Sequence, residues 1–228
     1  METLETPPRF APELPFKFVG GQTALDLVNT ADWPSTGPAL DRLSDYTRLL
    51  EWAGEAAVLG AASAGRLRKL AAGNPAAAEQ AVERCRELRR VLHRCAVALV
   101  SGRGVPATLV RLDPYLHEAL AHLVLEPGGP GSMGVRAGWS GLDESLEGPM
   151  WPVVWDAVQL FLSPEVEQLR VCGGENCGWV YVDRSRNGLR RWCEMDTCGT
   201  TAKNRRRGRR PRASARRTTA ALARKTTV

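Results

Sequence analysis

The chain has 228 residues, of which 43% are hydrophobic and 25% are charged, and its formal net charge at neutral pH is +6. This composition is ordinary for a globular protein with one sizeable core and a small additional module. No apolar stretch approaches the roughly 18 residues that a membrane-spanning helix needs, and the N-terminal sequence METLETPPRFAPELPFKF lacks the basic and apolar regions of a signal peptide. We therefore expect a cytoplasmic protein with reduced thiols and no membrane partner.

Charge is distributed unevenly along the chain. Residues 184–228 contain 15 lysines and arginines but only two acidic residues, which gives this segment a charge of +13. The remaining chain has 16 basic and 23 acidic residues, a charge of −7. An acidic body with a basic end is typical of proteins that bind a polyanion at that end, and the alternative is a solvated charged tail.

The N-terminal segment predicts short elements. Residues 1–15 contain four prolines and predict an irregular arm, and residues 16–19 alternate like a short strand that ends at two glycines. Residues 23–30, TALDLVNT, fit either a buried helical turn or a strand. Within them, Asp26 and Asn29 are interpreted as capping and turn residues rather than as the lining of a pocket.

Helices are predicted over the next sixty residues. Ser44 is a suitable N-cap for a helix that runs to about Trp52, and the alanine-rich residues 55–70 continue the helical character. Asn74-Pro75 is a helix start signal, and the helix that it opens is expected to reach Val100 and to end at Gly102.

The predicted helix after Asn74 has one apolar face, with hydrophobic residues at steps of three and four. Cys85 and Cys95 lie on that face, which favours small buried hydrophobic residues over a second metal site. His93 lies outside the face, so we expect a surface histidine.

Two further helices and a hairpin complete this part of the chain. Residues 106–121 and 149–162 predict helices, and residues 122–126 with 134–139 predict a β-hairpin around a turn rich in proline and glycine. The predicted fold class is therefore α+β, with a mainly helical N-terminal domain that contains a small antiparallel sheet.

Four cysteines near the C-terminus form two pairs with equal spacing, C-x4-C-x15-C-x4-C. Four thiolates complete the tetrahedral coordination of Zn²⁺, which makes a structural site with no open position for catalysis. A glycine follows the second cysteine of each pair, and glycine allows a tight turn whose amides face the ligand sulfur. The alternative is four free or disulfide-bonded cysteines. The predicted Zn²⁺ ligands are Cys172, Cys177, Cys193 and Cys198.

The segment around these cysteines predicts a small zinc module. Residues 178–183 predict a strand, Asn187-Gly188 predicts a turn, and residues 189–193 predict a returning strand. A helix is predicted over residues 201–207. A knuckle, a hairpin and a helix whose first turn supplies the last ligand form a treble-clef arrangement.

Basic residues of this module are the candidate nucleic-acid contacts. Helical residues three or four apart share a face that can follow phosphates. The predicted contacts are Lys203, Arg205, Arg206, Arg207, Arg209 and Arg210, with the hairpin residues Arg190, Arg191, Arg184 and Arg186 as secondary candidates. Trp179 and Trp192 are expected to pack on each other or on the body, because the module is too small for a core of its own. Residues 212–228 are expected to form a basic disordered tail.

The portions CGWVYVDRSRN and RRWCEMDTCG resemble the CGNR zinc finger of bacteria, and FVGGQTALDLVNT with the helix around Trp52 resembles the ABATE domain that accompanies it. The resemblance implies an ABATE-like α+β domain over residues 16–166 and a CGNR-like finger over residues 167–211. It also implies a stress-associated transcription regulator with a DNA-binding zinc finger. Together with the cysteine spacing and the basic C-terminal segment, it leads us to expect Zn²⁺-dependent binding of double-stranded DNA by the finger and an N-terminal domain that senses a small effector or dimerises.

Two adjacent positions depart from the family pattern. Cys198-Gly199 is followed by Thr200 and Thr201, where the family has Asn and Arg. The ligand and its glycine are kept, so zinc binding is expected. The amide and the guanidinium that recognise base edges or phosphates are missing, so we expect weaker sequence specificity than in a typical member.

Two other functions stay open at this point, and a third, catalysis, is not expected. RNA binding is compatible with the same arginines, because they bind phosphates of either nucleic acid. A protein-interaction finger is also compatible with the motif. We do not expect an enzyme, since the sequence has no P-loop, GxSxG or HExxH motif, and its histidines, His93, His117 and His122, all precede the finger.

Overall fold

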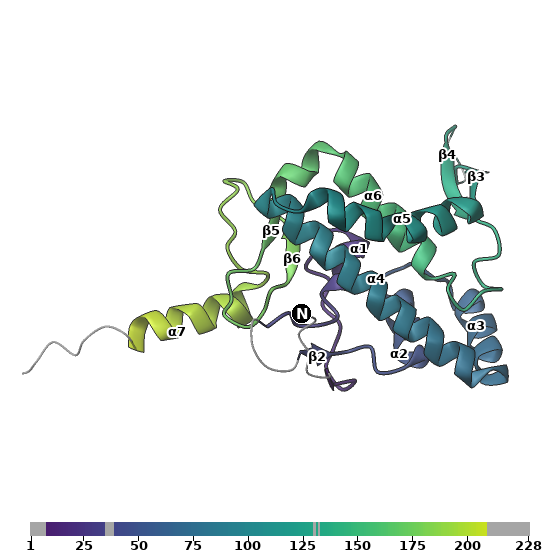
Figure 1. Ribbon diagram of the computed structural model, residues 1–228, viewed down its shortest axis with the longest axis horizontal. Coiled ribbons are helices and arrows are strands. Elements are labelled where there is room, and N and C mark those ends of the chain that lie inside the picture. The colour runs from purple at the N-terminus through teal and green to yellow at the C-terminus, as the bar shows by residue number, and fades with distance from the viewer. Residues whose placement is uncertain (1–7, 35–38, 130, 132, 209–228) are drawn as a thin grey trace, which may run out of the picture.

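Figure 1 shows the computed structural model, which describes residues 8–34, 39–129, 131 and 133–208, without the side chains of residues 207 and 208. The helices are α1 (Thr23–Val28), α2 (Tyr46–Glu55), α3 (Ala61–Gly73), α4 (Pro75–Ser101), α5 (Val105–His122), α6 (Met150–Leu162) and α7 (Thr200–Gly208). A 3-10 turn, η1 (Pro164–Gln168), and a π-helical turn, η2 (Met195–Gly199), lie between them.

The strands pair in twos within the described residues. The parallel pair is β1 (Arg9–Phe10) with β2 (Leu40–Asp41); the antiparallel pairs are β3 (Leu123–Pro127) with β4 (Val135–Trp139), and β5 (Leu169–Val171) with β6 (Val180–Val182). The predicted α+β class, mainly helical with a small antiparallel sheet, is confirmed. Below, the body is the described part up to residue 168, and the finger is residues 169–208. No helix in the described part of the chain is long and apolar enough to cross a membrane.

Helix α4 is the longest helix, and local signals set both of its ends. The Asn74 side chain accepts a hydrogen bond from the backbone N–H of Ala77 at 3.1 Å, and Pro75 is the first helical residue. Gly102 ends the helix in the left-handed region, at φ 67°. The predicted start and end are confirmed. From this position α4 packs against α1, α2, α3 and α5.

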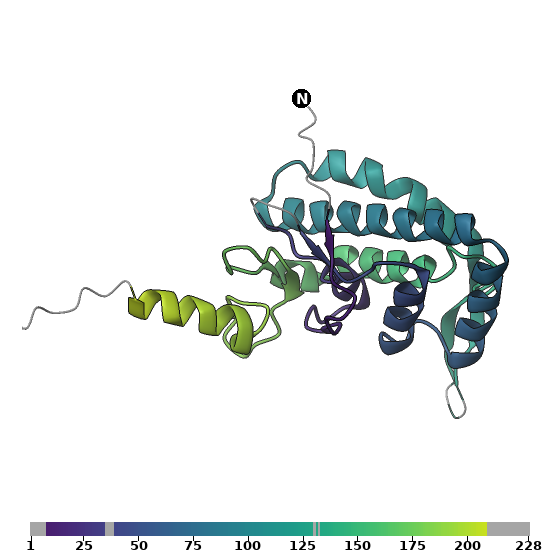
Figure 2. The ribbon, with the colours of Figure 1, turned by 90° about the horizontal axis from the view of Figure 1, so that it is seen from below.

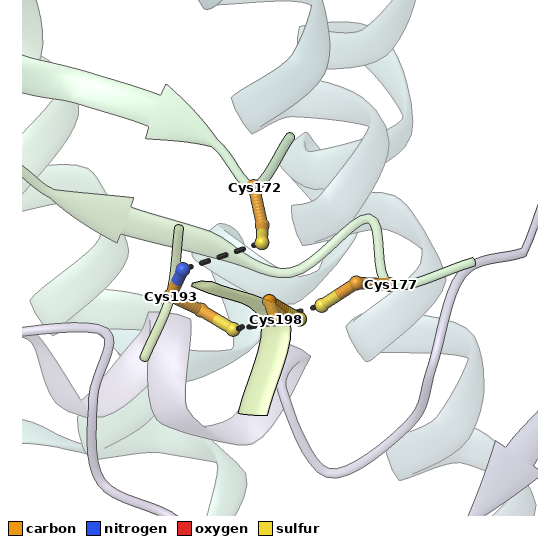
Figure 3. Close-up of side chains that lie close together, drawn as sticks. All are labelled: Cys172, Cys177, Cys193 and Cys198. Carbon is orange, nitrogen blue, oxygen red and sulfur yellow. Dashed lines mark hydrogen bonds between the residues drawn. The ribbon is translucent and has the colours of Figure 1, made fainter. Parts of the chain in front are cut away.

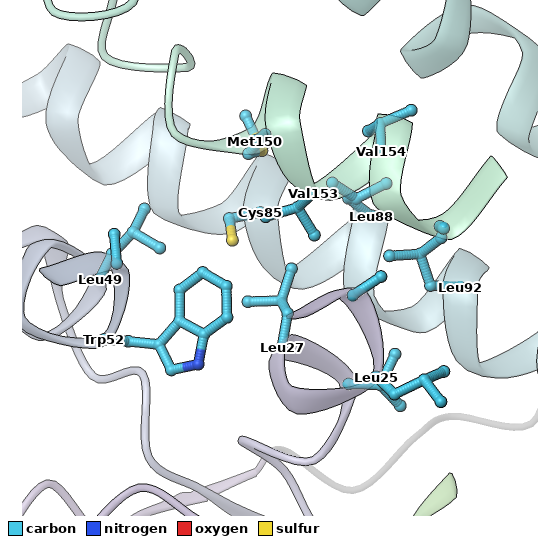
Figure 4. Packing of buried hydrophobic residues seen from close by; sticks show 14 of the residues in the cluster. Leu25, Leu27, Leu49, Trp52, Cys85, Leu88, Leu92, Met150, Val153 and Val154 are labelled. Atoms are coloured by element: carbon cyan, nitrogen blue, oxygen red, sulfur yellow. The ribbon is translucent and has the colours of Figure 1, made fainter. Parts of the chain in front are cut away.

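The core of the body lies where α1, α2, α4 and α6 meet (Figure 4). Leu27 of α1 and Leu88 of α4 are completely buried there, and the Trp52 ring of α2 lies beside them. Cys85 and Cys95 belong to the same core, as predicted. Burial raises the pKa of the Cys85 thiol to about 12, so this cysteine is an unreactive packing residue.

Several local predictions need correction. Residues 16–19 are not a strand, because their backbone lacks a ladder partner among the described residues; the Phe16 side chain is buried in the core instead. The ambiguous segment is helical, as α1. The N-cap of α2 is Asp45, which accepts a hydrogen bond from the Arg48 N–H, and the Ser44 hydroxyl donates to Asp45 instead of capping the helix. The arm predicted over residues 1–15 contains strand β1.

The alanine-rich segment is also divided. Instead of one continuous helical stretch over residues 55–70, α2 ends at Glu55 and α3 begins at Ala61. Between them Ala57 has a φ of 57°, a left-handed conformation that a continuing helix does not allow. The two helices are therefore separate elements, and both pack against α4.

The finger and the body share one hydrophobic core. Leu169 of β5 and Val180 and Val182 of β6 are buried at 2% exposure or less, and they belong to the same cluster as the side chains of α1, α4 and α6. Both β5 and β6 pack against α4. Because the β5–β6 pair completes the core of the body, the finger has a fixed position on the body.

Candidate metal centre and nucleic-acid interface

The four predicted ligands converge on one point (Figure 3). Cys172 follows β5, Cys177 ends the knuckle before β6, Cys193 lies in the loop after β6, and Cys198 lies in the π-helical turn η2. All six cysteines of the chain are free of disulfides, and the four Sγ atoms of this group lie within 4.8 Å of one another.

The geometry of the group fits a zinc ion. Zn–S bonds of about 2.3 Å in a tetrahedron require sulfurs about 3.8 Å apart. The distances from Cys193 Sγ to Cys177 Sγ and to Cys198 Sγ are both 3.7 Å. Cys172 and Cys193 are buried, whereas Cys177 and Cys198 are half-buried. Four thiolates in this arrangement hold Zn²⁺ as a structural ion with no ligand position left for a substrate.

Backbone amides stabilise negative charge at the first ligand. Cys172 Sγ accepts hydrogen bonds from the N–H groups of Cys193 at 3.2 Å and Gly174 at 3.4 Å. Hydrogen bonds from the neighbouring thiols lower the pKa of Cys172 to about 2. The pKa of Cys177 is raised, because its thiol proton is held in hydrogen bonds with Cys172 and Cys193. A zinc ion replaces these shared protons, so metal binding to this site releases protons.

Glycines are required where the chain approaches the sulfurs. A Cβ at Gly174 would lie 2.8 Å from Cys198 Sγ, too close for any other residue. Gly178, predicted as a turn glycine, has a φ of +65°. Gly199, the other predicted glycine, has no positive φ, and a Cβ there would meet Met195 Sδ at 2.8 Å. Gly174 was not among the predicted turn glycines, although a glycine between paired cysteines is a readable signal.

Asn29 of the body fixes the finger strand β6. Its side-chain amide donates to the Val180 carbonyl at 2.9 Å and accepts from the Val180 N–H at 3.0 Å, so it replaces one residue of a neighbouring strand. Gly20 adds a second such contact, because its carbonyl accepts a hydrogen bond from the Val182 N–H. Asn29 is the C-cap residue of α1, as predicted, and its side chain has a second role as a connection between body and finger.

A stacked pair of rings supports the turn after the second ligand. Trp33 and His93 lie parallel with ring centroids 4.0 Å apart, and His93 Nε2 is 3.0 Å from the Gly178 carbonyl oxygen. The backbone N–H of Trp33 donates to the Cys177 carbonyl at 2.8 Å. The prediction of a surface histidine is wrong, because the finger folds back over α4 and covers His93. Burial lowers the pKa of His93 to about 4.

The predicted hairpin between the cysteine pairs is also wrong in part. Strand β6 covers Val180–Val182, but residues 189–193 form no strand. Strand β5 occupies one edge of β6, and Asn29 and Gly20 occupy the other, so no edge remains for a returning strand. Side chains hold the returning segment instead: Tyr181 donates to the Arg190 carbonyl at 2.8 Å.

The two tryptophans have different surroundings. Trp179 is buried, and its indole N–H donates to the Ala31 carbonyl at 2.9 Å and lies 3.0 Å from Asp32 Oδ1. It therefore packs on the body, one of the two predicted outcomes. Trp192 is half-buried in a small cluster with the ligand cysteines, and the Arg191 guanidinium lies 5.2 Å from its ring centroid.

Helix α7 projects from the metal centre away from the body in both views (Figures 1 and 2). It begins two residues after Cys198, and the Thr200 hydroxyl donates to the Met195 carbonyl at 3.0 Å in its first turn. Lys203 and Arg206 are exposed on this helix. Arg191 and Arg186 are exposed on the loop after β6. These side chains give this end of the finger an exposed positive charge.

Other predicted contacts are occupied by intramolecular bonds. Arg190 donates to the carbonyls of Trp192, Val19 and Cys193, and its guanidinium lies 4.1 Å from the Tyr181 ring centroid. Its side chain is therefore a structural element of the finger and is no longer a candidate contact for nucleic acid.

Arg184 pairs with Glu165 and donates to the Gly21 carbonyl, which ties the finger to the body. Arg205 forms an ion pair with Glu175. The side chain of Arg207, residues Arg209 and Arg210, and the tail predicted over residues 212–228 lie outside the described part.

Comparison with family models supports this architecture. The ABATE model, described as "Putative stress-induced transcription regulator", matches residues 21–164. The chain belongs to the ABATE family. The CGNR zinc finger model matches residues 168–211, which contain all four clustered cysteines. A comparison with curated proteins gave no match.

The two matched segments of this ABATE protein meet through Asn29. This residue lies in the ABATE segment, and its partner Val180 lies in the CGNR segment. The structure therefore gives the TALDLVNT stretch a physical role as the docking element for the finger. The metal centre and the body are mechanically connected through it.

Proposed function

We propose that this ABATE protein is a bacterial transcription regulator that binds double-stranded DNA through its Zn²⁺-loaded finger. One observation carries the proposal: an exposed basic helix, α7, begins two residues after the metal ligand Cys198 and projects from a fixed body. Zinc sets the position of Cys198 and therefore the direction of α7. Lys203 and Arg206 on α7, with Arg186 and Arg191 on the preceding loop, contact phosphates.

The contacts favour affinity over sequence recognition. Thr200 uses its hydroxyl within the helix start, and Thr201 has a short side chain, so neither offers the bidentate recognition of a base that Asn or Arg provides. Positive charge attracts the duplex regardless of sequence. We propose that the finger arrangement is treble-clef-like, that the protein acts in the cytoplasm, and that it is a binding protein without catalytic activity.

Fluorescence anisotropy with a random DNA duplex tests this proposal. The zinc-loaded full chain is titrated across a salt series, and structured RNA of equal charge is the competitor. We expect binding that weakens steeply with salt, and a lower affinity for RNA than for the duplex. Preference for RNA would favour the second candidate, an RNA-binding finger, and no binding at low salt would favour a protein-interaction finger.

Two sets of variants separate the finger from simple charge. Cys193→Ser removes a metal ligand and should abolish tight binding, whereas unchanged binding would assign the affinity to the basic residues beyond the finger. The double variant Lys203→Gln, Arg206→Gln should lower the slope of log affinity against log salt by about 2, at about 0.9 for each phosphate contact. Arg111→Gln, an exposed arginine on α5, is the matched control and should leave the slope unchanged.

A further inference from the structure

A cavity of about 630 Å³ lies between the finger and the body, beside the metal centre. The body contributes Lys17, Asp32 and Arg42, and the finger contributes residues 173–177 and the start of α7. This volume is within the range of small-molecule sites, about 300–1,000 Å³. A single zinc ion bonded at about 2.3 Å occupies a small part of it. The cavity is therefore larger than the metal centre requires.

Arg42 is a buried cation whose hydrogen bonding is incomplete. It is 7% exposed, and it lines the cavity with its guanidinium 5.2 Å from the Trp179 ring centroid. Within the described residues its side-chain hydrogen bonds both come from Nη1, to the Thr30 carbonyl and to Asp32, and both are 3.4 Å long. Its Nε has no partner there. A guanidinium has five N–H donors, so burial with two long bonds leaves it in need of acceptors.

Cationic side chains exceed acidic ones around the cavity. The charged lining residues are Lys17, Arg42, Arg205 and Arg206 against Asp32 and Glu175. Arg205 is paired with Glu175, and Lys17 with Glu194 at the edge of the finger. Zinc-bound thiolates add negative charge at one wall. Because ion pairs and thiolates offset part of the positive charge, binding of an anion in the cavity needs direct contacts with Arg42, Lys17 and Arg206.

The rest of the lining is suited to an apolar group. The lining includes Trp179, which is 4% exposed, and Ala202, while Gly173 and Gly174 have no side chain. An inorganic ion alone would leave this surface in contact with water. A ligand with a flat apolar part and one negative group uses both parts of the lining.

We propose that this cavity binds a small organic anion, with its negative group at Arg42 and its apolar part against Trp179. The ligand bridges the ABATE body and the first turns of α7. Binding to the cavity does not require nucleic acid, so this proposal can be tested without DNA.

Isothermal titration calorimetry of the zinc-loaded full chain tests the proposal with three probes. They are 2-naphthoate, its neutral isostere 2-naphthamide, and inorganic phosphate. We expect 2-naphthoate to bind with a Kd of about 0.1–1 mM, the range that a ligand of this size reaches, and at least tenfold more tightly than either other probe. Equal binding of the naphthoate and the naphthamide, or of the naphthoate and phosphate, would overturn the proposal, as would absence of naphthoate binding up to 10-fold above that range.

Variants place the bound probe. Arg42→Met should weaken 2-naphthoate binding at least tenfold, and Arg111→Met, on the far helix α5, should leave it unchanged. Because Arg42 is buried, Lys17→Met provides a second, half-buried test, with an expected loss of about threefold to tenfold. Zinc content and thermal unfolding are measured for each variant. Unchanged affinity in folded, zinc-loaded Arg42→Met and Lys17→Met would place the anion elsewhere and refute the site.

Discussion

Replacement of Asn29 by alanine is expected to loosen the finger from the body. The change removes the amide that satisfies both the N–H and the carbonyl of Val180. Val180 is completely buried and Asn29 is 1% exposed, so water cannot take the place of the amide without opening the core. Each buried group left without a partner costs about 1–3 kcal/mol, which gives a loss of about 2–6 kcal/mol in the free energy of unfolding.

Urea denaturation of the zinc-loaded protein, followed by tryptophan fluorescence, measures this loss. Asn187→Ala is the matched control, because Asn187 is exposed in the turn after β6 and should change stability by less than about 0.5 kcal/mol. Zinc release to a chelator should also be faster in Asn29→Ala, since β6 leads away from Cys177. A loss below about 0.5 kcal/mol would refute the reasoning that Asn29 holds β6.

Two further predictions concern glycine and pH. Gly178→Ala should lower the free energy of unfolding by about 3 kcal/mol or more, because a Cβ would lie 2.6 Å from Trp33 Cβ. Gly188→Ala is the control: Gly188 has a similar φ of +61° but lies in open space, so this variant should show only the backbone cost of about 1–2 kcal/mol. Burial raises the pKa of Asp26 to about 6 and lowers the pKa of His93 to about 4. As pH rises from 4 to about 6, Asp26 therefore lowers the free energy of unfolding of the wild type by about 3 kcal/mol. Over the same interval His93 raises it by a similar amount. Relative to wild type, Asp26→Asn should gain stability over that interval and His93→Gln should lose it, in urea titrations at each pH.

Different results would contradict these predictions. Equal costs for the two glycine variants would show that Trp33 moves aside without penalty. Parallel pH profiles for wild type and either titration variant would show that the group in question keeps the same pKa in the folded and unfolded chain. Comparison with wild type at each pH removes the contribution of zinc ligation, which all three proteins share.

Sequence reasoning succeeded where the deciding contacts are local. The ends of α4 depend on Asn74, Pro75 and Gly102, which act within a few residues of their own position. The spacing of the cysteines likewise reports a knuckle and a helix start, and the four sulfurs do converge. Apolar periodicity placed Cys85 in the core for the same reason.

Prediction from the sequence failed where the contacting residue is distant in the chain. His93 looks exposed on an isolated helix, and the finger that covers it is 85 residues away. Asn29 pairs with a strand 151 residues away, and that pairing also removes the edge on which a second finger strand was predicted. Helical and strand patterns carry no information about which distant backbone a side-chain amide will imitate.

The continuous core also restricts how the protein can change in evolution. A finger transferred to another body by recombination would carry Leu169, Val180 and Val182 without the α1 and α4 surfaces that cover them. A body that lost its finger would expose those surfaces and the amide of Asn29 to water. The two segments are therefore expected to be inherited together, and substitutions on one side of the junction should be accepted only with matching substitutions on the other.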